Sequence, residues 1–509
     1  MSAPLLAGLG ILIPLLGALG VALTGRRPDL REAVSLASAT AMAFAVAALF
    51  PEVLAGGRPQ LQLLEILPGL SLVLVVEPLG LLFAMIASAL WILTTVYAIG
   101  YMRGNNEAHQ TRFYVCFAVA LAATCGIAFA GNLLTLFIFY EALTLATYPL
   151  VTHKGDDAAR AGGRVYLGVL LGTSIGILLV AIIATWAVAG SIAFQDGGIL
   201  AGKASPFVAS VLFALFMFGI GKAALMPFHR WLPAAMVAPT PVSALLHAVA
   251  VVKAGVFAVL KITIYIFGID FLDASGAAEF IMWVAAFTLL AASLVALRKD
   301  NLKARLAYST VSQLAYVVLG ATLATAMGVM GGSLQIAMHA VGKITLFFCA
   351  GAIYTAAHKT EVSTMDGLGR VMPFTFAAFL IAALSIIGLP PLGGAWSKWY
   401  LMVGAADAGQ TVMIGVLMLS SLLNVAYLLP VPARGFFRPL PGTTDESSAP
   451  GTETSRIQLS RIREAPLTCV VPLCITALGC LLMFFYGDAV FTLLAPVIEA
   501  STVTARLMP

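Results

Sequence analysis

The stretch that decides the fold is GKAALMPFHRWLPAAMVAPTPVSALLHAVAVVKAGVFAVLK, residues 221–261. It lies in an otherwise apolar chain, yet it holds three lysines, two histidines and four prolines. Proline inside a helix removes a backbone hydrogen bond and kinks or breaks the helix. Inside a bilayer, such a break is tolerated only where protein or a water-filled cavity surrounds it. We therefore expect a helix broken at Pro227, a polar re-entry and a second helix that carries His247 and Lys253.

The composition indicates an all-α polytopic membrane protein. The 509 residues are 61% hydrophobic and only 10% charged, with a mean hydropathy of +1.00, which no soluble domain matches. The net charge of +5 requires no nucleic-acid partner, because the positive-inside rule accounts for the basic residues. The six cysteines lie in apolar runs without metal-ligand spacing, so we interpret them as small buried hydrophobes. The apolar N-terminus lacks a charged leader segment, which favours a first transmembrane helix over a cleaved signal peptide.

The apolar runs and the basic residues together predict the topology. Runs of about 20 residues divide the chain into about fourteen transmembrane helices. If the basic segment 26–31 lies inside, most lysines and arginines of the loops fall on that side, and only Arg58, Lys203 and Arg506 fall opposite. This bias predicts a multi-pass protein of a bacterial-type inner membrane with both termini on the outer side. The longest polar stretch, 434–464, is expected to be a flexible cytoplasmic loop.

Two predicted helices are interrupted in the same way, which indicates an internal repeat. The seventh (207–237) breaks at Pro227 near Lys222, and the twelfth (371–406) breaks at Pro390 and Pro391 near Lys398. They are five helices apart, so two five-helix units would have opposite orientation, as in many transporters. We expect N-terminal helices in 1–111, a first unit in 112–266, an inverted second unit in 267–431, a loop in 432–465 and a last helix in 466–509.

Glu141 and Lys222 are the first candidates for proton transfer. Glu141 lies mid-span in NLLTLFIFYEALTLATYPL (132–150), and we interpret it as the only acid near the middle of a span. An ammonium at membrane depth is costly and is by default part of an ion or proton path. A carboxylate that moves toward or away from a lysine changes how tightly the lysine holds its proton. The alternatives are a purely structural carboxylate for Glu141 and a lysine that reaches the membrane surface for Lys222.

The eighth helix adds His247, Lys253 and Lys261. His247 and Lys253 are six residues apart, so they do not share a helix face, but water between them would link them as successive stations. Histidine titrates near physiological pH and suits such a relay, although a core imidazole without this role stays possible. Lys261 is nearer the outer end, and we weigh a place in a half-channel evenly against snorkelling to the membrane surface.

The second unit offers an equivalent set. His339 and Lys343 are four residues apart and share a helix face at mid-span, which predicts the proton station of this unit. Lys398 follows the second break and would be the terminal residue of the path. Ser309 and Gln313 either hold water in a half-channel or hydrogen-bond neighbouring helices together, and both interpretations stay open.

The remaining polar residues have weaker roles. His229 follows the first break and is a candidate for the inner mouth of a half-channel, and His358 has a similar but weaker position. We expect His153 and the charged residues in 154–160 to be solvated. The sequence contains no nucleotide-binding motif, no metal-ligand pattern and no Ser/His/Asp arrangement, so we expect neither a cofactor nor a catalytic site.

Five stretches resemble a known family. They are Tyr140-Glu141, the segment 221–255, STVSQLAY (309–316), MHAVGKITLFF (338–348) and GLPPLGGAWSKW (388–399). Together they resemble the antiporter-like subunits shared by respiratory complex I, membrane-bound hydrogenases and Mrp-type multisubunit Na+/H+ antiporters. The resemblance implies fourteen core helices, two inverted five-helix units with broken seventh and twelfth helices, and proton half-channels joined by a polar axis in the middle of the membrane.

The resemblance also implies roles for matching residues. By motif, Glu141 and Lys222 correspond to the charged pair, and Lys398 corresponds to the exit. His247 with Lys253 corresponds to the connecting station, and His339 with Lys343 to the station of the second unit. Within the family the chain looks most like the D-type member of Mrp antiporters, because Lys398 replaces the glutamate of the complex I M-type member and no long lateral helix follows.

These observations predict a proton-translocating subunit rather than an enzyme. Its expected partners are the lipid bilayer and other membrane subunits of a complex that exchanges Na+ for protons. The chain lacks a dense cluster of intramembrane carboxylates, which a hard cation such as Na+ would favour, so we expect the sodium path in a partner subunit. Two rival hypotheses are a proton-pumping subunit of a redox complex, such as an NADH-quinone oxidoreductase or a membrane-bound hydrogenase, and a scaffold that has lost transport.

Overall fold

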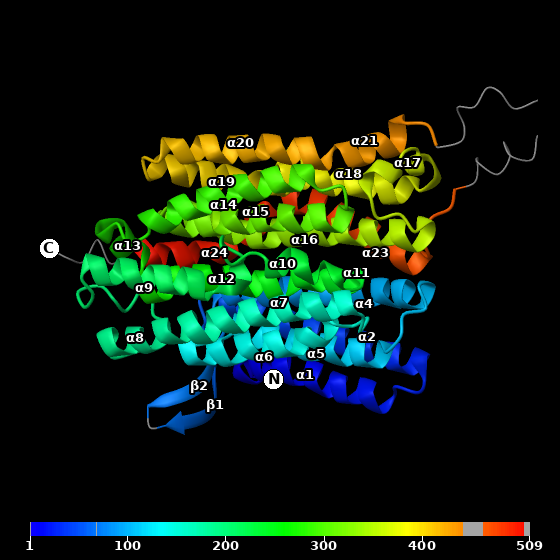
Figure 1. The fold of residues 1–509 in the computed structure, drawn as a ribbon. Helices are drawn as coiled ribbons and strands as arrows, with labels where there is room; N and C mark the ends of the chain where they lie inside the picture. The colour runs from blue at the N-terminus through cyan, green and yellow to red at the C-terminus, as the bar shows by residue number, and fades with distance from the viewer. Residues whose placement is uncertain (1, 68, 441–461, 503–509) are drawn as a thin grey trace, which may run out of the picture.

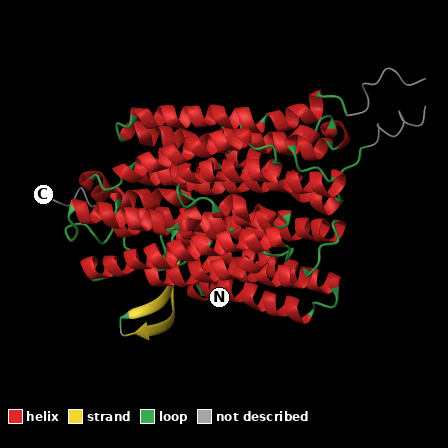
Figure 2. Ribbon diagram, in the orientation of Figure 1, coloured by secondary structure: helices red, strands yellow, loops and turns green. Residues whose placement is uncertain are grey.

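Nearly parallel helices lie side by side in a single bundle (Figures 1 and 2). The structure is a computed structural model that describes residues 2–67, 69–440 and 462–502. Helix α1 (Ala3–Leu23) lies at one edge of the bundle and α20 (Thr411–Leu428) at the other, so chain order runs roughly across it. Most of the predicted loop 432–465, and Arg506 with it, lies outside the described residues.

The elements before the middle of the chain are mostly long helices, joined by short turns and a hairpin. They are α1, α2 (Pro28–Ala47), α3 (Phe50–Leu54), β1 (Gln60–Leu67), β2 (Leu70–Val75), α4 (Pro78–Gly104), α5 (Gln110–Ala128), α6 (Leu133–Val151), α7 (Asp157–Thr173), η1 (Ser174–Leu178), α8 (Leu179–Ala189), α9 (Pro206–Gly219), η2 (Gly221–Ala223), α10 (Trp231–Ala234), η3 (Ala235–Val237), α11 (Thr240–Ala244), η4 (Leu245–Val249), α12 (Val251–Ile262) and η5 (Thr263–Phe267).

The later elements repeat this pattern of long helices with one interruption. They are α13 (Ile269–Ser275), α14 (Glu279–Arg298), α15 (Leu302–Thr322), α16 (Ala326–Ala357), η6 (Val362–Thr364), α17 (Leu368–Val371), α18 (Pro373–Ile387), α19 (Gly394–Asp407), α20, α21 (Pro430–Phe437), α23 (Leu467–Phe485) and α24 (Gly487–Thr502).

The chain is a multi-pass membrane protein with two helices at its centre. Among the described residues, eleven helices are long and apolar enough to cross a membrane. The run Thr240–Phe267 has 100% of its most apolar window buried and Ala326–Ala357 has 94%, whereas the edge runs Ala3–Leu23 and Thr411–Phe437 have 39% and 33%. The polar residues of α12 and α16 therefore face protein rather than lipid.

Both interruptions predicted from prolines are present. Helix α9 ends at Gly219, and the chain passes through η2 and Pro227 before α10 begins. Helix α18 ends at Ile387, and α19 begins at Gly394 after the two prolines. Glycine permits close contact at each break: a Cβ on Gly255 would lie 2.4 Å from the backbone of Lys222, and a Cβ on Gly394 would lie 1.9 Å from the carbonyl oxygen of Ser385.

The structure corrects the sequence prediction at two places. The segment between the second and third predicted helices, expected to be a loop, contains an antiparallel hairpin, in which Gln60 pairs with Val75. The predicted last helix divides into α23 and α24 at Gly487, whereas the second predicted span remains one candidate span, Pro28–Leu54, with a short turn between α2 and α3. The hairpin forms because its first strand, QLQLLEIL, alternates polar and apolar residues at its start, and Asn132 donates to the carbonyl of Ser71 at 2.8 Å.

Candidate functional site

Lys222 lies inside the first helix break and is fully buried. Its Nζ donates to the carbonyl oxygen of Tyr140 at 2.8 Å and to Oγ1 of Thr144 at 2.6 Å. The same ammonium lies 3.2 Å from the centroid of the Tyr140 ring, a cation–π contact that stabilises a positive charge away from water. The Tyr140 hydroxyl accepts from the backbone N–H of Lys222 at 3.0 Å. One tyrosine on α6 therefore holds both the side chain and the backbone of the break.

Glu141 follows Tyr140 on α6 but does not contact Lys222. Within the described chain, both carboxylate oxygens of Glu141 are buried without a hydrogen-bond partner. The ion pairs closer than 4.0 Å among the described residues do not include Lys222. A buried carboxylate without a donor is costly, so the position of Glu141 needs an explanation beyond packing.

From the sequence we group Lys253 with His247, and the structure places Lys253 against a histidine of another helix. Nζ of Lys253 on α12 lies 2.7 Å from Nδ1 of His339 on α16, so the two central helices meet through a lysine and an imidazole. His247 packs against Phe347 with ring centroids 4.7 Å apart and a tilt of 37° between the rings. Its ring nitrogens have no hydrogen-bond partner among the described residues. His339 thus contacts Lys253 of α12 from α16, the helix that also carries Lys343.

Lys343 continues the axis one turn beyond His339. Its Nζ donates to Oγ of Ser309 at 2.6 Å and to the carbonyl oxygen of Leu306 at 3.3 Å. Ser309 also accepts from the Tyr427 hydroxyl at 2.9 Å, and Tyr427 in turn contacts the Asn424 amide. These contacts form a continuous series of hydrogen bonds from α16 through α15 to α20.

A second polar chain runs from α15 to the second break. Gln335 donates through Nε2 to Oε1 of Gln313 at 2.8 Å, and its own Oε1 accepts from Ser397 at 2.5 Å. Ser397 directly precedes Lys398. Gln313 therefore connects neighbouring helices in this structure.

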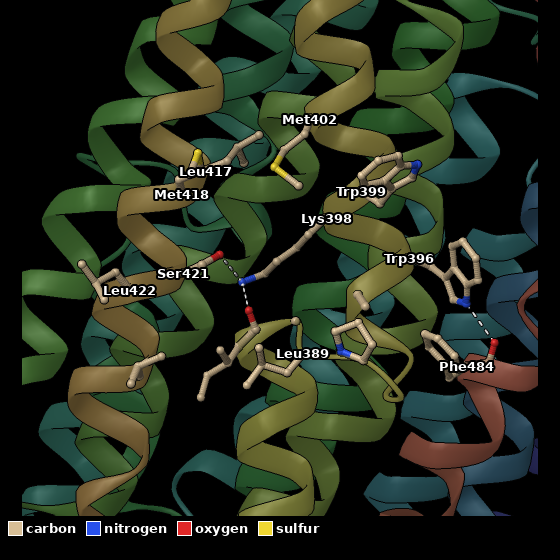
Figure 3. Close-up of a pocket in the computed structure, with 15 residues that line it drawn as sticks. Leu389, Trp396, Lys398, Trp399, Met402, Leu417, Met418, Ser421, Leu422 and Phe484 are labelled. Atoms are coloured by element: carbon tan, nitrogen blue, oxygen red, sulfur yellow. Dashed lines mark hydrogen bonds between the residues drawn. The ribbon is translucent and has the colours of Figure 1, made fainter.

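Lys398 lies at the second break beside a cavity. Figure 3 shows its ammonium between the two halves of the broken helix, where it donates to the carbonyl oxygen of Ile387 and to Ser421, each at 2.8 Å. The cavity has a volume of about 610 Å³ and is lined mainly by apolar side chains, among them Trp396, Trp399 and Leu422. Lys398 and Ser421 are its polar groups. Among the ion pairs of the described residues, none includes Lys398.

Lys261 does not snorkel to a surface. Its side chain is 1% exposed, and its Nζ lies 2.6 Å from Oε1 of Glu77, whose side chain is 5% exposed. Sequence reasoning missed Glu77, because it sits at the predicted start of a helix rather than in mid-span. Glu77 is the N-cap of α4, so it does not bear on the interpretation of Glu141 as an acid near the middle of a span.

The histidines near the membrane edges differ in burial. His229 is half-buried next to Pro227 in a cavity of about 600 Å³, and His358 is exposed at the end of α16. We expected His153 in solvent, but it is 3% exposed and packs edge-on against Phe113. Burial lowers the pKa of His153 to about 4, because a charged imidazole loses its hydration. The neighbouring charged residues in 154–160 are exposed as expected.

Sequence reasoning pointed to Ser309, which accepts from Lys343, but missed several other groups that pair with the lysines. They are Tyr140, Thr144, Ser421 and the Ile387 carbonyl, with Glu77 as the ion-pair partner of Lys261. Thr144 is four residues from Tyr140, one helix turn apart, and this spacing was the available signal. The others come from distant elements or from the backbone, where a sequence carries no signal.

Comparison with known proteins identifies relatives in two kinds of complex. The family described as NADH:quinone oxidoreductase/Mrp antiporter, transmembrane region, matches residues 130–424. NADH-quinone oxidoreductase subunit N of Desulforudis audaxviator (strain MP104C) is 31% identical over 436 residues, which cover 84% of each chain. A probable K(+)/H(+) antiporter protein of the A/B type from Rhizobium meliloti (strain 1021) is 30% identical over 79% of this chain, but the match spans only 40% of that relative.

One solved structure has the same fold over nearly the full length. A chain of the Mrp complex from Dietzia sp. DQ12-45-1b superposes with a TM-score of 0.83. The superposition covers 98% of this chain and 97% of the other, at 23% sequence identity. At this identity the likeness establishes the fold.

Proposed function

Because the chain belongs to the NADH:quinone oxidoreductase/Mrp antiporter family, we propose that it is the proton-carrying subunit of an Mrp-type monovalent cation (Na+)/H+ antiporter, most like the D-type member. Members of this family are subunits of transporters or of redox complexes. The observation that carries the proposal is the row of buried lysines, Lys222, Lys253, Lys343 and Lys398, none more than 6% exposed.

The contacts between these lysines suggest the order of proton transfer. Lys222 begins the path beside Glu141, and Lys253 passes the proton to His339 at 2.7 Å. Lys343, one turn along α16, continues toward Ser309, and Lys398 ends the path. Water bridges the gaps between stations, since the hydrogen bonds of each lysine reach only its immediate neighbours. The scaffold hypothesis is disfavoured, because each ammonium inside a membrane is costly to retain.

Glu141 supplies the control step. When its carboxylate swings toward Nζ of Lys222, it stabilises the ammonium; when it swings away, Tyr140 and Thr144 remain the only acceptors. A lysine with fewer stabilising neighbours releases its proton more readily. His247, which has no hydrogen-bond partner among the described residues, would then join the path through water.

The proposal also includes a membrane topology and a set of partner subunits. The eleven spanning helices, the broken pairs α9–α10 and α18–α19, and α15 together make fourteen spans, arranged as inverted units in 112–266 and 267–431. Both termini lie on the outer side of a bacterial-type inner membrane. Partner subunits carry the Na+ path, and the complex exchanges cytoplasmic Na+ for external protons. This chain itself would be a transporter subunit and not an enzyme.

A second candidate function is proton pumping within a redox complex. The subunit N relative favours it, because that match is long in both chains. The same lysine row would serve, and electron transfer in other subunits would supply the energy. The companion genes distinguish the two candidates, since a redox complex needs subunits with Fe–S and flavin motifs.

The test uses inverted vesicles from cells that carry the whole operon. Wild type is compared with Lys222→Ala and with the control Lys203→Ala, whose ammonium caps the carbonyl of Ala189 away from the lysine row. We expect Na+ to collapse a preformed pH gradient in wild type and in the control, but not in Lys222→Ala, with equal amounts of assembled complex.

Other results lead to other conclusions. If Na+ has no effect but NADH or another reductant builds a gradient, the chain works in a redox complex. If Lys222→Ala behaves as wild type in both assays, the lysine path is wrong. Loss of activity in Lys203→Ala would show that the assay reports assembly rather than proton transfer.

A further inference from the structure

A second group of buried charges lies near the β1–β2 hairpin, away from the lysine row. Lys261 and Glu77 form an ion pair at 2.6 Å with both side chains almost fully buried. Closer to solvent, Arg58 and Asp196 form a second ion pair at 2.8 Å, with each side chain 38% exposed. Tyr265 is also buried and follows Lys261 by four residues, about one helix turn. The two ion pairs thus lie at different depths, one near solvent and one inside the bundle.

Lys261, the buried lysine of this group, lies on the same ridge of α12 as Lys253 of the lysine row. Lys253, Phe257 and Lys261 follow at intervals of four residues, so they are neighbours along the helix. With a rise of 1.5 Å per residue, Lys253 and Lys261 are about 12 Å apart along the axis. That is too far for direct proton transfer and requires water between them.

An aromatic pair fills the interval between the two lysines. Phe257 packs against Phe83 of α4 with ring centroids 5.0 Å apart, and the two side chains are 0% and 1% exposed. Lys261 lies 5.5 Å from the Phe257 ring. Helices α4 and α12 therefore meet through this aromatic pair, close to the ion pair of Glu77 and Lys261. A hydrophobic constriction of this kind blocks conduction by excluding water.

We propose that Glu77 and Lys261, with Tyr265 and the Arg58–Asp196 pair, form a proton site at the hairpin end of the first unit, and that Phe83 and Phe257 form the barrier between this site and Lys253. The inference rests on the proposed function of the chain. Glu77 takes up a proton from the outer solution past Arg58 and Asp196 and becomes a neutral acid, while Lys261 keeps its charge. When the rings separate and water enters, Glu77 gives this proton to the neutral Lys253 amine. Lys253 becomes an ammonium, Glu77 becomes a carboxylate again, and the ion pair re-forms.

A structural role for the ion pair is the competing explanation. In that case the pair only fixes the hairpin end of α4 to α12. Replacing both members of a buried ion pair by apolar residues of similar size usually preserves stability, whereas removing one member does not. The double variant Glu77→Leu/Lys261→Met therefore separates the two explanations. We expect it to assemble normally and to lose most driven proton transport.

The barrier is tested by passive proton leak in vesicles that contain the whole complex without Na+ or reductant. We expect Phe257→Ala, and independently Phe83→Ala, to dissipate a pH gradient severalfold faster than wild type. The matched control is Phe117→Ala, which removes one ring from another buried aromatic pair, Phe113–Phe117, with centroids 5.5 Å apart. Vesicles that contain this variant should leak protons no faster than wild-type vesicles.

The outcomes separate this inference from the proposed function. If Phe257→Ala and Phe83→Ala both leak protons no faster than wild type, at wild-type levels of complex, the proposed barrier is wrong. Normal driven transport in the double variant overturns the proton site, while Lys222→Ala still tests the lysine row. If wild type shows no driven transport but Phe257→Ala leaks, the barrier stands and the proposed function fails.

Discussion

The two helix breaks use the same device in different surroundings. Each presents a lysine to a backbone carbonyl and a hydroxyl: Tyr140 and Thr144 for Lys222, Ile387 and Ser421 for Lys398. Each ammonium also lies over an aromatic ring, 3.2 Å from the centroid of Tyr140 for Lys222 and 4.9 Å from that of Tyr316 for Lys398. The first ammonium is sealed within the protein near the Glu141 carboxylate. The second lies beside an apolar cavity of about 610 Å³. Under the proposed function, we expect electrostatic control of the proton at the first break and exchange of the proton with the surroundings of the bundle at the second.

The largest expected effect comes from neutralising the second lysine. Lys398→Met keeps the length of the side chain and removes the proton carrier, so we expect driven proton transport to fall by at least about a hundredfold, as for loss of an acid–base group. The measurement is Na+-driven or reductant-driven decay of a pH gradient at matched levels of complex. Leu422→Ala, on the same cavity wall, is the control and should retain transport. An equal loss of driven proton transport in both variants would mean that transport depends on the shape of the cavity rather than on the ammonium.

A smaller effect is expected from the acid that distinguishes the first break. Glu141→Gln keeps the size of the side chain and removes its charge, so we expect driven transport to fall roughly tenfold, equivalent to about 1.4 kcal/mol. Passive leak should stay unchanged, because Lys222 keeps its contacts with Tyr140 and Thr144. Unchanged driven transport would contradict the control step and make the two breaks functionally equivalent.

The smallest effect is expected from the two hydroxyls. Thr144→Val and Ser421→Ala each remove one acceptor from a lysine, and a hydrogen bond contributes about 0.5–1.5 kcal/mol. We expect Thr144→Val to reduce transport more, because Lys222 is fully buried and no water replaces the lost acceptor, whereas water from the cavity replaces it at Lys398. Initial rates of gradient decay measure both variants. The reverse order would show that the cavity beside Lys398 is dry.

Much of this architecture could be read from local sequence signals. Proline reports a helix break wherever it falls in an apolar run, because the missing N–H belongs to the residue itself. Pro227, Pro390 and Pro391 therefore located both interruptions, and the cost of a buried ammonium marked Lys222 and Lys398 as functional candidates. The division of the last helix and the hairpin near Gln60 were missed, since they depend on contacts with neighbouring elements.

The sequence by itself determined that the chain spans a membrane many times, that two of its helices are broken, and that Lys222, Lys253, Lys343 and Lys398 lie within apolar runs. Only the tertiary structure decided which groups meet: Lys253 with His339, Lys343 with Ser309, and Lys261 with Glu77. The physical reason is that hydropathy and backbone breaks are properties of single residues and short segments. A hydrogen bond between side chains depends on how distant helices rotate and approach each other, which packing of the whole bundle sets.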